Sequence, residues 1–246
     1  MKQFNIITVY PDFFESFKNH GLIKKGLLKK LIEINILNIR NFTDDKHKRV
    51  DFKPYGGGPG MIIQYCPVKK AIDSLNQGKT IMLSPQGERL TQKKLACLSN
   101  ESNLNFICGR YEGVDQRIID NLVDEEISIG DYVLSGGEIP AAAVIEGIVR
   151  LIPDIAENMS SIENDSFSNQ LLEYPQYTKP NLVDGLSVPD VLISGNHSEV
   201  ERWRRKHSLG VTMLKRPDLL KNVNLSKEDD RLLQEFIAEQ MEQDSD

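Results

Sequence analysis

The sequence predicts an α/β fold with a mostly parallel sheet, followed by a small and mostly helical C-terminal domain. Short apolar stretches with strand character alternate with stretches of helical periodicity through the first 150 or so residues. A polar stretch without any period then interrupts this alternation, and the chain beyond it is rich in turns and then helical. We therefore divide the chain into residues 1–156, an interdomain linker at 157–170, and residues 171–246.

The predicted elements of the first domain alternate in order along the chain. Strands are expected at 4–10, 34–42, 80–84, 104–108 and 126–129. Helices are expected at 11–33 with a break near Gly21, and at 68–75, 91–98, 114–122 and 138–152. This order indicates a parallel sheet with helices on both faces, in which ligands bind beyond the carboxyl ends of the strands. The glycine-rich loop 43–60 is long enough to suggest a function of its own.

The expected helix 138–152 is unusually apolar, which is typical of a helix buried in a core or an interface. Pro140 suits its first turn, where a missing N–H costs nothing. Glu146 and Arg150 alone interrupt the apolar run, at the i, i+4 spacing of a stabilising pair. That pairing explains both charges without any catalytic role.

The second domain offers two helix-start signals and one cluster of basic residues. Ser198 begins a capping box, and Ser226 can cap a last helix whose apolar face is formed by Leu232, Leu233, Phe236 and Ile237. Basic side chains gather at Arg202, Arg204, Arg205 and Lys206. They either meet a nucleic-acid backbone or pair with Glu199, Glu201 and the acidic last helix.

Composition restricts the classes of partner. The net charge is −6, but residues 227–246 alone carry eight acids and two bases, so the rest of the chain is neutral and carries local basic clusters. These clusters lie at 24–30, 46–49 and 202–206, and local basic patches of this kind can bind a polyanion. Runs of charged residues are, however, more often solvent-exposed surfaces without a partner. No apolar run approaches the roughly 20 residues of a membrane span. We also expect no signal peptide, and the three dispersed cysteines suit a reducing cytoplasm.

Three glycine-rich segments are the most informative part of the chain. They span residues 55–61, 107–113 and 129–138, each on a loop between predicted elements. One tight turn needs only one or two glycines, so three clusters suggest loops that converge on one ligand. The apolar loop 129–138 suits a flat aromatic ligand held by main-chain groups, whereas the plainer interpretation is a strand-to-helix turn.

Several familiar chemistries have no motif in this chain. The run 56–60 lacks the Lys-Ser/Thr ending of a P-loop, and no Gly-x-Gly-x-x-Gly follows the first strand. There is no Gly-x-Ser-x-Gly elbow, and neither the cysteines nor the four histidines have metal-ligand spacing, so no metal ligands are assigned.

The same glycine segments carry a resemblance to a known family. Residues 55–61, 83–87, 108–115, 129–138, 165–180 and 194–205 resemble bacterial tRNA (guanine-N1)-methyltransferases in order and spacing. The resemblance implies a SPOUT-type sheet with a deep trefoil knot, and a helical tRNA-binding domain at 171–246. It also implies a cytoplasmic homodimer with each active site at the subunit interface. S-adenosylmethionine would be the methyl donor, and N1 of the guanosine immediately 3′ of the tRNA anticodon the acceptor.

The resemblance also implies roles for individual residues. The donor would bind at Ser84, Pro85, Gly109, Ile129, Gly130, Asp131, Tyr132, Val133, Leu134, Gly136 and Gly137. N1 of guanine carries a proton, so the reaction needs a base and a group that stabilises charge developing at O6. Asp165 and Arg150 match the family's residues for these two roles, and Glu112 matches an acidic position near the guanine and a proposed magnesium site. The alternatives are an RNA-binding protein of the same fold without catalysis, and a methyltransferase acting on ribosomal RNA or on a ribose hydroxyl.

Overall fold

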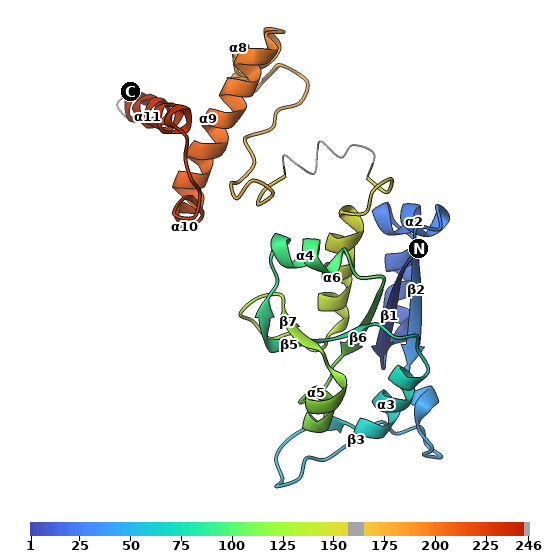
Figure 1. The fold of residues 1–246 in the computed structure, drawn as a ribbon. Coiled ribbons are helices and arrows are strands. Elements are labelled where there is room, and N and C mark those ends of the chain that lie inside the picture. Colours follow the sequence, from blue (N-terminus) through green and yellow to red (C-terminus); the bar gives the residue numbers. More distant parts are fainter. Residues whose placement is uncertain (157–164, 244–246) are drawn as a thin grey trace. The chain divides into compact units, whose positions relative to one another are not determined.

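The computed structural model describes residues 1–156 and 165–243 (Figure 1). The chain divides into two compact units, residues 1–157 and 158–246. The function of each unit, and the exact limits of the linker between them, stay predictions. No helix among the described residues is long and apolar enough to cross a membrane.

The first unit is built on a five-stranded sheet in the order β2-β1-β6-β5-β7. These strands are β1 (Lys2–Thr8), β2 (Ile32–Asn38), β5 (Lys79–Arg89), β6 (Asn103–Cys108) and β7 (Glu125–Ser128). Every pairing between them is parallel, as the alternating pattern predicted. A separate two-stranded ribbon joins β3 (Asp51–Phe52), within the long glycine-rich loop, to β4 (Ile62–Ile63), just after it.

Helices cover both faces of this sheet, which confirms the predicted three layers (Figure 1). One face carries η1 (Pro11–Phe13), α1 (Phe14–Lys18), α2 (Gly21–Leu28), α4 (Gln92–Leu98) and α6 (Glu138–Arg150). The other carries η2 (Ile39–Phe42), α3 (Tyr65–Asp73) and α5 (Gln116–Leu122). Successive side chains of a strand point to opposite faces, so Phe4 and Ile6 enter one core and Ile7 enters the other.

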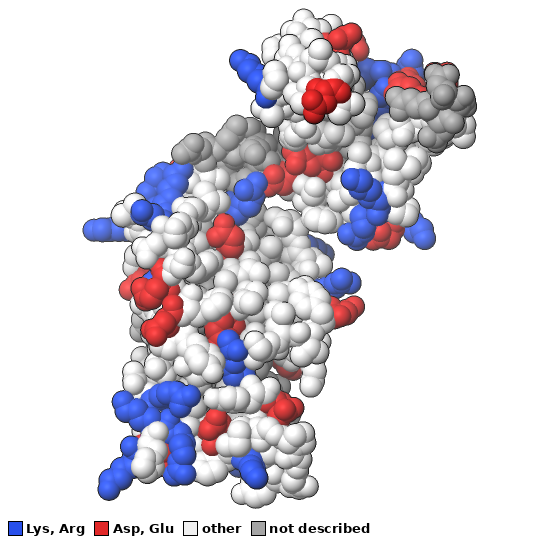
Figure 2. Space-filling model, turned by 180° about the vertical axis from the view of Figure 1, so that it is seen from behind, with Lys and Arg blue, Asp and Glu red and all other residues white. Residues whose placement is uncertain are grey.

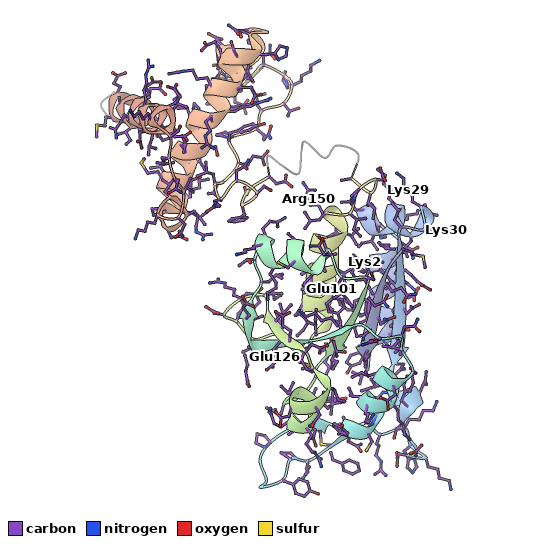
Figure 3. The ribbon with its side chains drawn as sticks, viewed as in Figure 1. Lys2, Lys29, Lys30, Glu101, Glu126 and Arg150 are labelled. Carbon is purple, nitrogen blue, oxygen red and sulfur yellow. The ribbon has the colours of Figure 1, made fainter. Side chains whose placement is uncertain are left out.

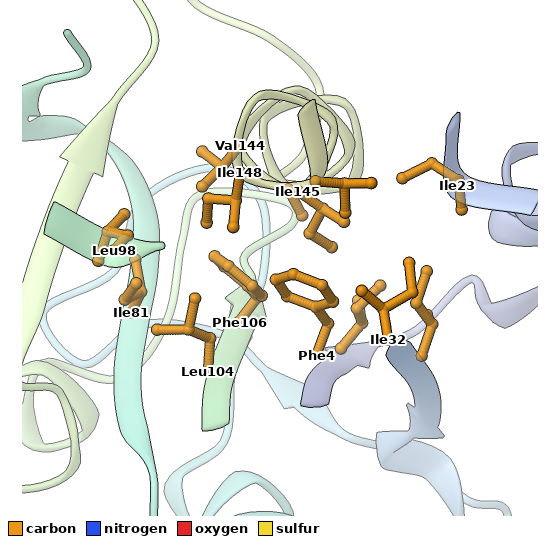
Figure 4. Packing of buried hydrophobic residues seen from close by; sticks show 14 of the residues in the cluster. Phe4, Ile23, Ile32, Ile81, Leu98, Leu104, Phe106, Val144, Ile145 and Ile148 are labelled. Carbon is orange, nitrogen blue, oxygen red and sulfur yellow. The ribbon is translucent and has the colours of Figure 1, made fainter. Parts of the chain in front are cut away.

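The larger core lies between the sheet and α6. Phe4 and Phe106 stack with ring centroids 6.5 Å apart on neighbouring strands. Val144, Ile145 and Ile148 of α6 pack over these rings and are fully buried (Figure 4). This packing fixes α6 over the centre of the sheet and thereby fixes the loop that leads into it.

The opposite face of the sheet contains a buried row of asparagine side chains. Asn35 donates to Asn5 at 3.0 Å, and Asn5 donates to Asn105 at 2.8 Å, across three neighbouring strands. A strand shifted by one residue would remove its asparagine from this row and leave buried amides unpaired, which costs about 1–3 kcal/mol each. The row therefore favours a single register for β2, β1 and β6.

The helical stretch expected at 11–33 ends at Leu28, and Ile32 and Glu33 already belong to β2, so that limit was wrong. Two predicted strand ends differ by four or five residues, each for a local reason. The strand expected at 34–42 ends at Asn38, whose side chain accepts a hydrogen bond from Arg40 N at 3.0 Å and turns the chain into η2. The strand expected at 80–84 continues to Arg89, because Glu88 and Arg89 pair with β7 after a shift in register. A Cβ on Gly87 would lie 2.4 Å from the backbone of Glu126, so only glycine permits this second pairing.

The apolar helix α6 is buried on most of its surface but not all round. Seven of its residues are buried, whereas Ile139, Ala143 and Glu146 form an exposed stripe along one side. Burial raises the pKa of Glu146, and the positive charge of Arg150 opposes that shift. The expected interaction at i, i+4 is therefore present, and the exposed stripe is apolar at its N-terminal end.

The second unit is small and mostly helical, as expected from its composition. Its helices are α8 (Asp190–Ile193), α9 (His197–Lys215), α10 (Pro217–Leu220) and α11 (Lys227–Gln243), preceded by a hairpin of β8 (Leu182–Val183) and β9 (Leu186–Ser187). Leu171, Leu209 and Leu232 form the centre of its core. Trp203, His207 and Phe236 form a row of rings beside it.

The two predicted helix caps had different outcomes. Ser226 and Asp229 exchange side-chain to backbone hydrogen bonds, which confirms the cap of α11. The capping box expected at Ser198 was wrong, because α9 begins earlier and Asn196 supplies the capping side chain. Ser198 instead donates its hydroxyl to Asn196 Oδ1 at 2.8 Å.

The basic cluster of α9 is largely neutralised by acids of the same unit. Arg202 contacts Glu235 at 2.6 Å and Arg205 contacts Asp229 at 2.6 Å, both on α11. Lys206 contacts Glu239 at 2.5 Å, also on α11, and Arg204 contacts Glu201 one turn away at 2.6 Å. The structure thus favours the alternative in which these side chains hold the helices of the unit together.

Acid should weaken this unit through the pair of Arg205 and Asp229. The Arg205 guanidinium lowers the pKa of Asp229 to about 2, well below the value of about 3.9 in an unfolded chain. The stabilisation is complete above the unfolded pKa and is lost as the pH falls through the folded one. We expect Arg205→Ala to lower the stability of the unit by about 1 kcal/mol at pH 7 and to reduce its loss of stability between pH 4 and pH 2.

Fluorescence of Trp203, the single tryptophan of the chain, would follow this unfolding. Arg216→Ala is the matched control, because the pair of Arg216 with Asp218 is exposed on both sides. Equal effects of the two variants would contradict the importance of the α9–α11 pair.

Candidate active site

A pocket of about 480 Å³ lies at the carboxyl-end edge of the sheet. The segments that follow β6 and β7 form much of its wall, together with residues 82–86 of β5. The start of α6 closes it at Pro140. This is the position that parallel sheets offer to ligands, and the volume lies within the range of roughly 300–1,000 Å³ for small-molecule sites.

Two of the three glycine-rich segments line this pocket, and the first lies next to them. Gly137 N donates to Gly109 O at 3.0 Å, and Arg110 forms an isolated bridge with Gly136, which joins the second and third segments. Glu112 N donates to Met61 O at 3.0 Å, which joins the first segment to the second. The first segment does not line the pocket itself, but Gly60 in this segment packs against the side chain of Glu112, which does. A Cβ on Gly60 would lie 2.4 Å from Glu112 Cγ.

A fully buried carboxylate, Glu138, holds the loop segments together. Thr8 donates its hydroxyl to Glu138 Oε1 at 2.7 Å, and Arg110 Nε donates to Glu138 Oε2 at 2.9 Å. The Arg110 guanidinium also donates to the carbonyl and hydroxyl oxygens of Ser135, at 3.2 and 3.1 Å. It lies over the ring of Tyr10, 4.6 Å from the ring centre. One arginine therefore joins the end of β1, the loop after β6 and the loop before α6.

Close backbone approach explains why glycine occurs at the bottom of the pocket. A Cβ on Gly137 would lie 2.7 Å from the Cα of Cys108, and one on Gly136 would lie 2.1 Å from Arg110 Nε. Gly130 has φ +154, a backbone conformation that other residues rarely adopt. Cys108 beneath them is fully buried, and burial raises the pKa of its thiol well above the usual value.

The structure brings most of the predicted donor-binding residues to this one pocket. Those that line it are Ser84, Pro85, Gly109, Ile129, Gly130, Tyr132, Val133, Leu134, Gly136 and Gly137. Asp131 is exposed and lies outside the lining. The convergence of residues from 84 to 137 is what a shared ligand requires, while their contact with that ligand stays a prediction.

The three predicted catalytic residues lie in different parts of the chain, and within the first unit Glu112 and Arg150 are far apart. Glu112 lines the pocket and is exposed. Arg150 lies at the far end of α6, ten residues after Pro140 and thus about 15 Å along the helix axis (Figure 3). Asp165 belongs to the second unit.

Asp165 lines a small pocket of about 110 Å³ within the second unit. Arg204, Tyr174 and Ser208 share this pocket. The Arg204 guanidinium lies 5.1 Å from the centre of the Tyr174 ring, and among the described residues its buried Nε has no hydrogen-bond partner. The predicted base is therefore half-buried among polar side chains rather than on an open turn.

The sequence did not reveal the role of Arg110. Glu138 could have been noticed in the sequence, because a carboxylate at the start of an apolar helix needs a polar partner if it is buried. Its partners come from residues 8 and 110, too far away in sequence for any local pattern to identify them. No group of three or more His, Cys, Asp or Glu residues within 1–156 and 165–243 is arranged to hold a metal ion.

Comparison with known proteins agrees with this geometry. The family described as tRNA (Guanine-1)-methyltransferase TrmD matches residues 1–222. The chain belongs to this family. The match includes the first unit, the second unit as far as residue 222, and all of the glycine-rich segments.

Relatives named tRNA (guanine-N(1)-)-methyltransferase align along nearly the whole chain. One from Buchnera aphidicola subsp. Acyrthosiphon pisum is 52% identical over 223 residues, covering 89% of this chain and 94% of the relative. One from Vibrio vulnificus strain YJ016 is 49% identical over 239 residues, covering 95% and 96%. One from Buchnera aphidicola subsp. Baizongia pistaciae is 48% identical over 237 residues, covering 94% and 95%.

The pair of Arg110 and Glu138 should be essential for the stability of the first unit. Arg110→Ala leaves the buried Glu138 carboxylate without a counter-charge, so we expect a loss of about 3–5 kcal/mol in the free energy of unfolding. Urea denaturation followed by circular dichroism would measure it. Arg117→Ala is the matched control, because its pair with Asp115 is exposed and should contribute less than about 1 kcal/mol. A loss no larger than that of the control would show that Glu138 is held by other groups.

Proposed function

We propose that this chain transfers a methyl group from S-adenosylmethionine to N1 of the guanosine immediately 3′ of the anticodon in tRNA. One observation carries the proposal: ten of the predicted donor-binding residues line one pocket, in a chain whose relatives bear the corresponding name. The proposal includes a cytoplasmic location and the knotted SPOUT form of the sheet, both of which rest on the family resemblance.

The pocket suits the donor in shape and chemistry. Ile129, Val133, Leu134 and Pro140 supply apolar surface for a flat purine. The close packing at Gly136 and Gly137 keeps the main chain near the ligand, where its N–H and C=O groups can distinguish one heterocycle from another. When bound, S-adenosylmethionine supplies a methyl group already activated on a sulfonium.

Side chains of this chain would carry out the proton transfer and stabilise the charge that develops on the guanine. Asp165 would accept the proton from N1 of guanine, which frees the nitrogen lone pair for attack. Arg150 would donate to O6, where negative charge develops as that proton leaves. Glu112, at the mouth of the pocket beside Gly60, would face the guanine. Of the three predicted catalytic residues, Glu112 is the one that lines this pocket.

A second copy of the chain would complete the site. Arg150 lies about 15 Å along α6 from the pocket of its own chain, so it cannot act there. The exposed stripe of Ile139 and Ala143 runs toward it, and Val133 is 86% exposed at the pocket edge. Apolar surface of this kind favours contact with another protein surface. We therefore place the partner's Arg150 end of α6 against this pocket.

The direct test is mass spectrometry of tRNA after incubation with the protein, S-adenosylmethionine and magnesium. One N1-methylated guanosine should appear 3′ of the anticodon. A methyl group on ribose, methylation of ribosomal RNA alone, or no product at all would each overturn the proposal. The last outcome, together with retained tRNA binding, would identify an RNA-binding protein without catalysis.

Asp165→Asn should separate chemistry from binding. The amide keeps the shape of the side chain but cannot accept the N1 proton, so single-turnover methylation should fall by about 100-fold or more. Calorimetry should show donor affinity close to that of the unchanged protein, because Asp165 is not among the predicted donor-binding residues and those that line the pocket stay unchanged.

Asp154→Asn provides the control for this variant. Asp154 is an exposed acid whose positive φ asparagine tolerates, and its replacement should leave the rate unchanged. Equal losses in both variants, or a matching loss of donor affinity in Asp165→Asn, would remove Asp165 from the role of base.

A further inference from the structure

Aromatic and basic side chains lie around the end of the first unit that carries η2 and β3, and all of them except Arg40 and Arg110 are exposed. We call this the aromatic–basic surface, and it consists of Tyr10, Phe13, Arg40, Lys46, Lys48, Arg49, Phe52, Lys53, Arg110 and Tyr111. Figure 2 shows Lys and Arg side chains gathered at this lower end of the unit. The four aromatic residues of the surface are between 41% and 53% exposed, so their rings are accessible to a partner.

The surface is continuous with the candidate active site. Arg110 lines both the donor pocket and a second, shallower hollow formed with Tyr10, Phe13 and Arg40. Tyr111 also lines the donor pocket. Burial raises the pKa of Tyr111, and the nearby Asp51 and Tyr10 add to that shift, so these side chains lie together. A chain that enters the pocket at Glu112 can therefore continue directly over these rings.

The lysine charges of the surface are available, unlike the charges of α9, whereas Arg49 and Arg110 are paired with Asp45 and Glu138. Among the described residues Lys46, Lys48 and Lys53 form no ion pair, and all three are exposed. Of the nearby acids, Asp45 binds Arg49 of this surface with both oxygens, and Asp44 pairs with Lys70 outside it. Asp12 is the acid that lines the hollow itself.

Arg40 connects the hollow beside Tyr10 to the loop that carries Lys46 and Lys48. Its guanidinium donates to Lys48 O at 3.3 Å, which holds the lysine-bearing loop beside the hollow. Arg49 lies 5.7 Å from the centre of the Phe52 ring, and Arg110 lies 4.6 Å from that of Tyr10. Rings for base stacking and cations for phosphates are thus interleaved over one continuous area.

We infer that the aromatic–basic surface binds the single-stranded nucleotides flanking the target guanosine, with bases stacked on Tyr10 and phosphates at Lys48 and Lys53. The inference rests on the proposed function and identifies where the RNA loop lies. Single-stranded RNA presents unstacked bases that bind aromatic rings, whereas a duplex hides them. The interleaving of rings and unpaired cations is the arrangement that such a strand requires.

Two variants test the two parts of the inference by anisotropy with a labelled anticodon stem–loop RNA. Lys48→Gln with Lys53→Gln should weaken binding and flatten its dependence on salt, by about 0.7 in log–log slope for each phosphate that the protein no longer neutralises. Tyr10→Leu should weaken binding by roughly 5-fold or more, and Tyr10→Phe, which retains the ring, should restore it. Donor affinity should stay unchanged in the lysine variant.

Lys93→Gln is the control. Lys93 is exposed, lies on α4 outside the three basic clusters, and forms no ion pair among the described residues. The control should bind RNA as the unchanged protein does. An unchanged salt slope in the Lys48 and Lys53 variant, or an equal change in the control, would overturn the inference.

A second probe separates this inference from the proposed function. The same stem closed into an uninterrupted duplex should bind equally well to the unchanged protein and to Tyr10→Leu. If the unchanged protein methylates tRNA but Tyr10→Leu binds the stem–loop normally, the surface assignment alone fails. If the unchanged protein methylates no tRNA, the proposed function fails, whatever the variants bind.

Discussion

The candidate active site depends on one buried carboxylate. Glu138 is fully buried at the start of α6, where an unpaired charge would cost several kcal/mol. Thr8 and Arg110 satisfy it, and Arg110 can reach it only if the chain after β6 lies against the loop before α6. The pocket wall is thus a consequence of satisfying Glu138. Because α6 is anchored by its packing on Phe4 and Phe106, the carboxylate itself has little freedom to move.

Periodicity and glycine content were sufficient to predict the architecture and the place of the site. Strand alternation identified every strand of the main sheet, and the rule for parallel sheets located the pocket at the strand ends. The strand limits failed where a side chain or a second pairing decided them, as Asn38 and Gly87 show. The hydrogen-bond network around Glu138 could not be predicted, because it joins residues 8, 110 and 138, and no local sequence pattern encodes such a contact.

Charge was the feature that sequence predicted least well. Arg202, Arg205 and Lys206 look in sequence like a cationic face, but α11 supplies an acid for each of them. Lys48 belongs to the cluster 46–49 and Lys53 lies outside the clusters noted in the sequence, yet the structure leaves both exposed and outside any described ion pair. A run of basic residues shows only that cations are present. Whether they are available to a partner depends on which acids the fold brings within about 4 Å.

The sheet order also has a consequence for how the chain folds as it is made. β1 lies between β2 and β6, and its pairing with β6 joins Phe4 to Leu104, a hundred residues further along the chain. At about 5–20 residues per second, a ribosome would synthesise β6 roughly 5–20 s after β1. During this interval the apolar edge of β1 has only β2 beside it, so the nascent N-terminus is exposed to aggregation until β6 has emerged. Once β6 has been synthesised, hydrogen bonding among the buried asparagines of these strands favours only the correct register.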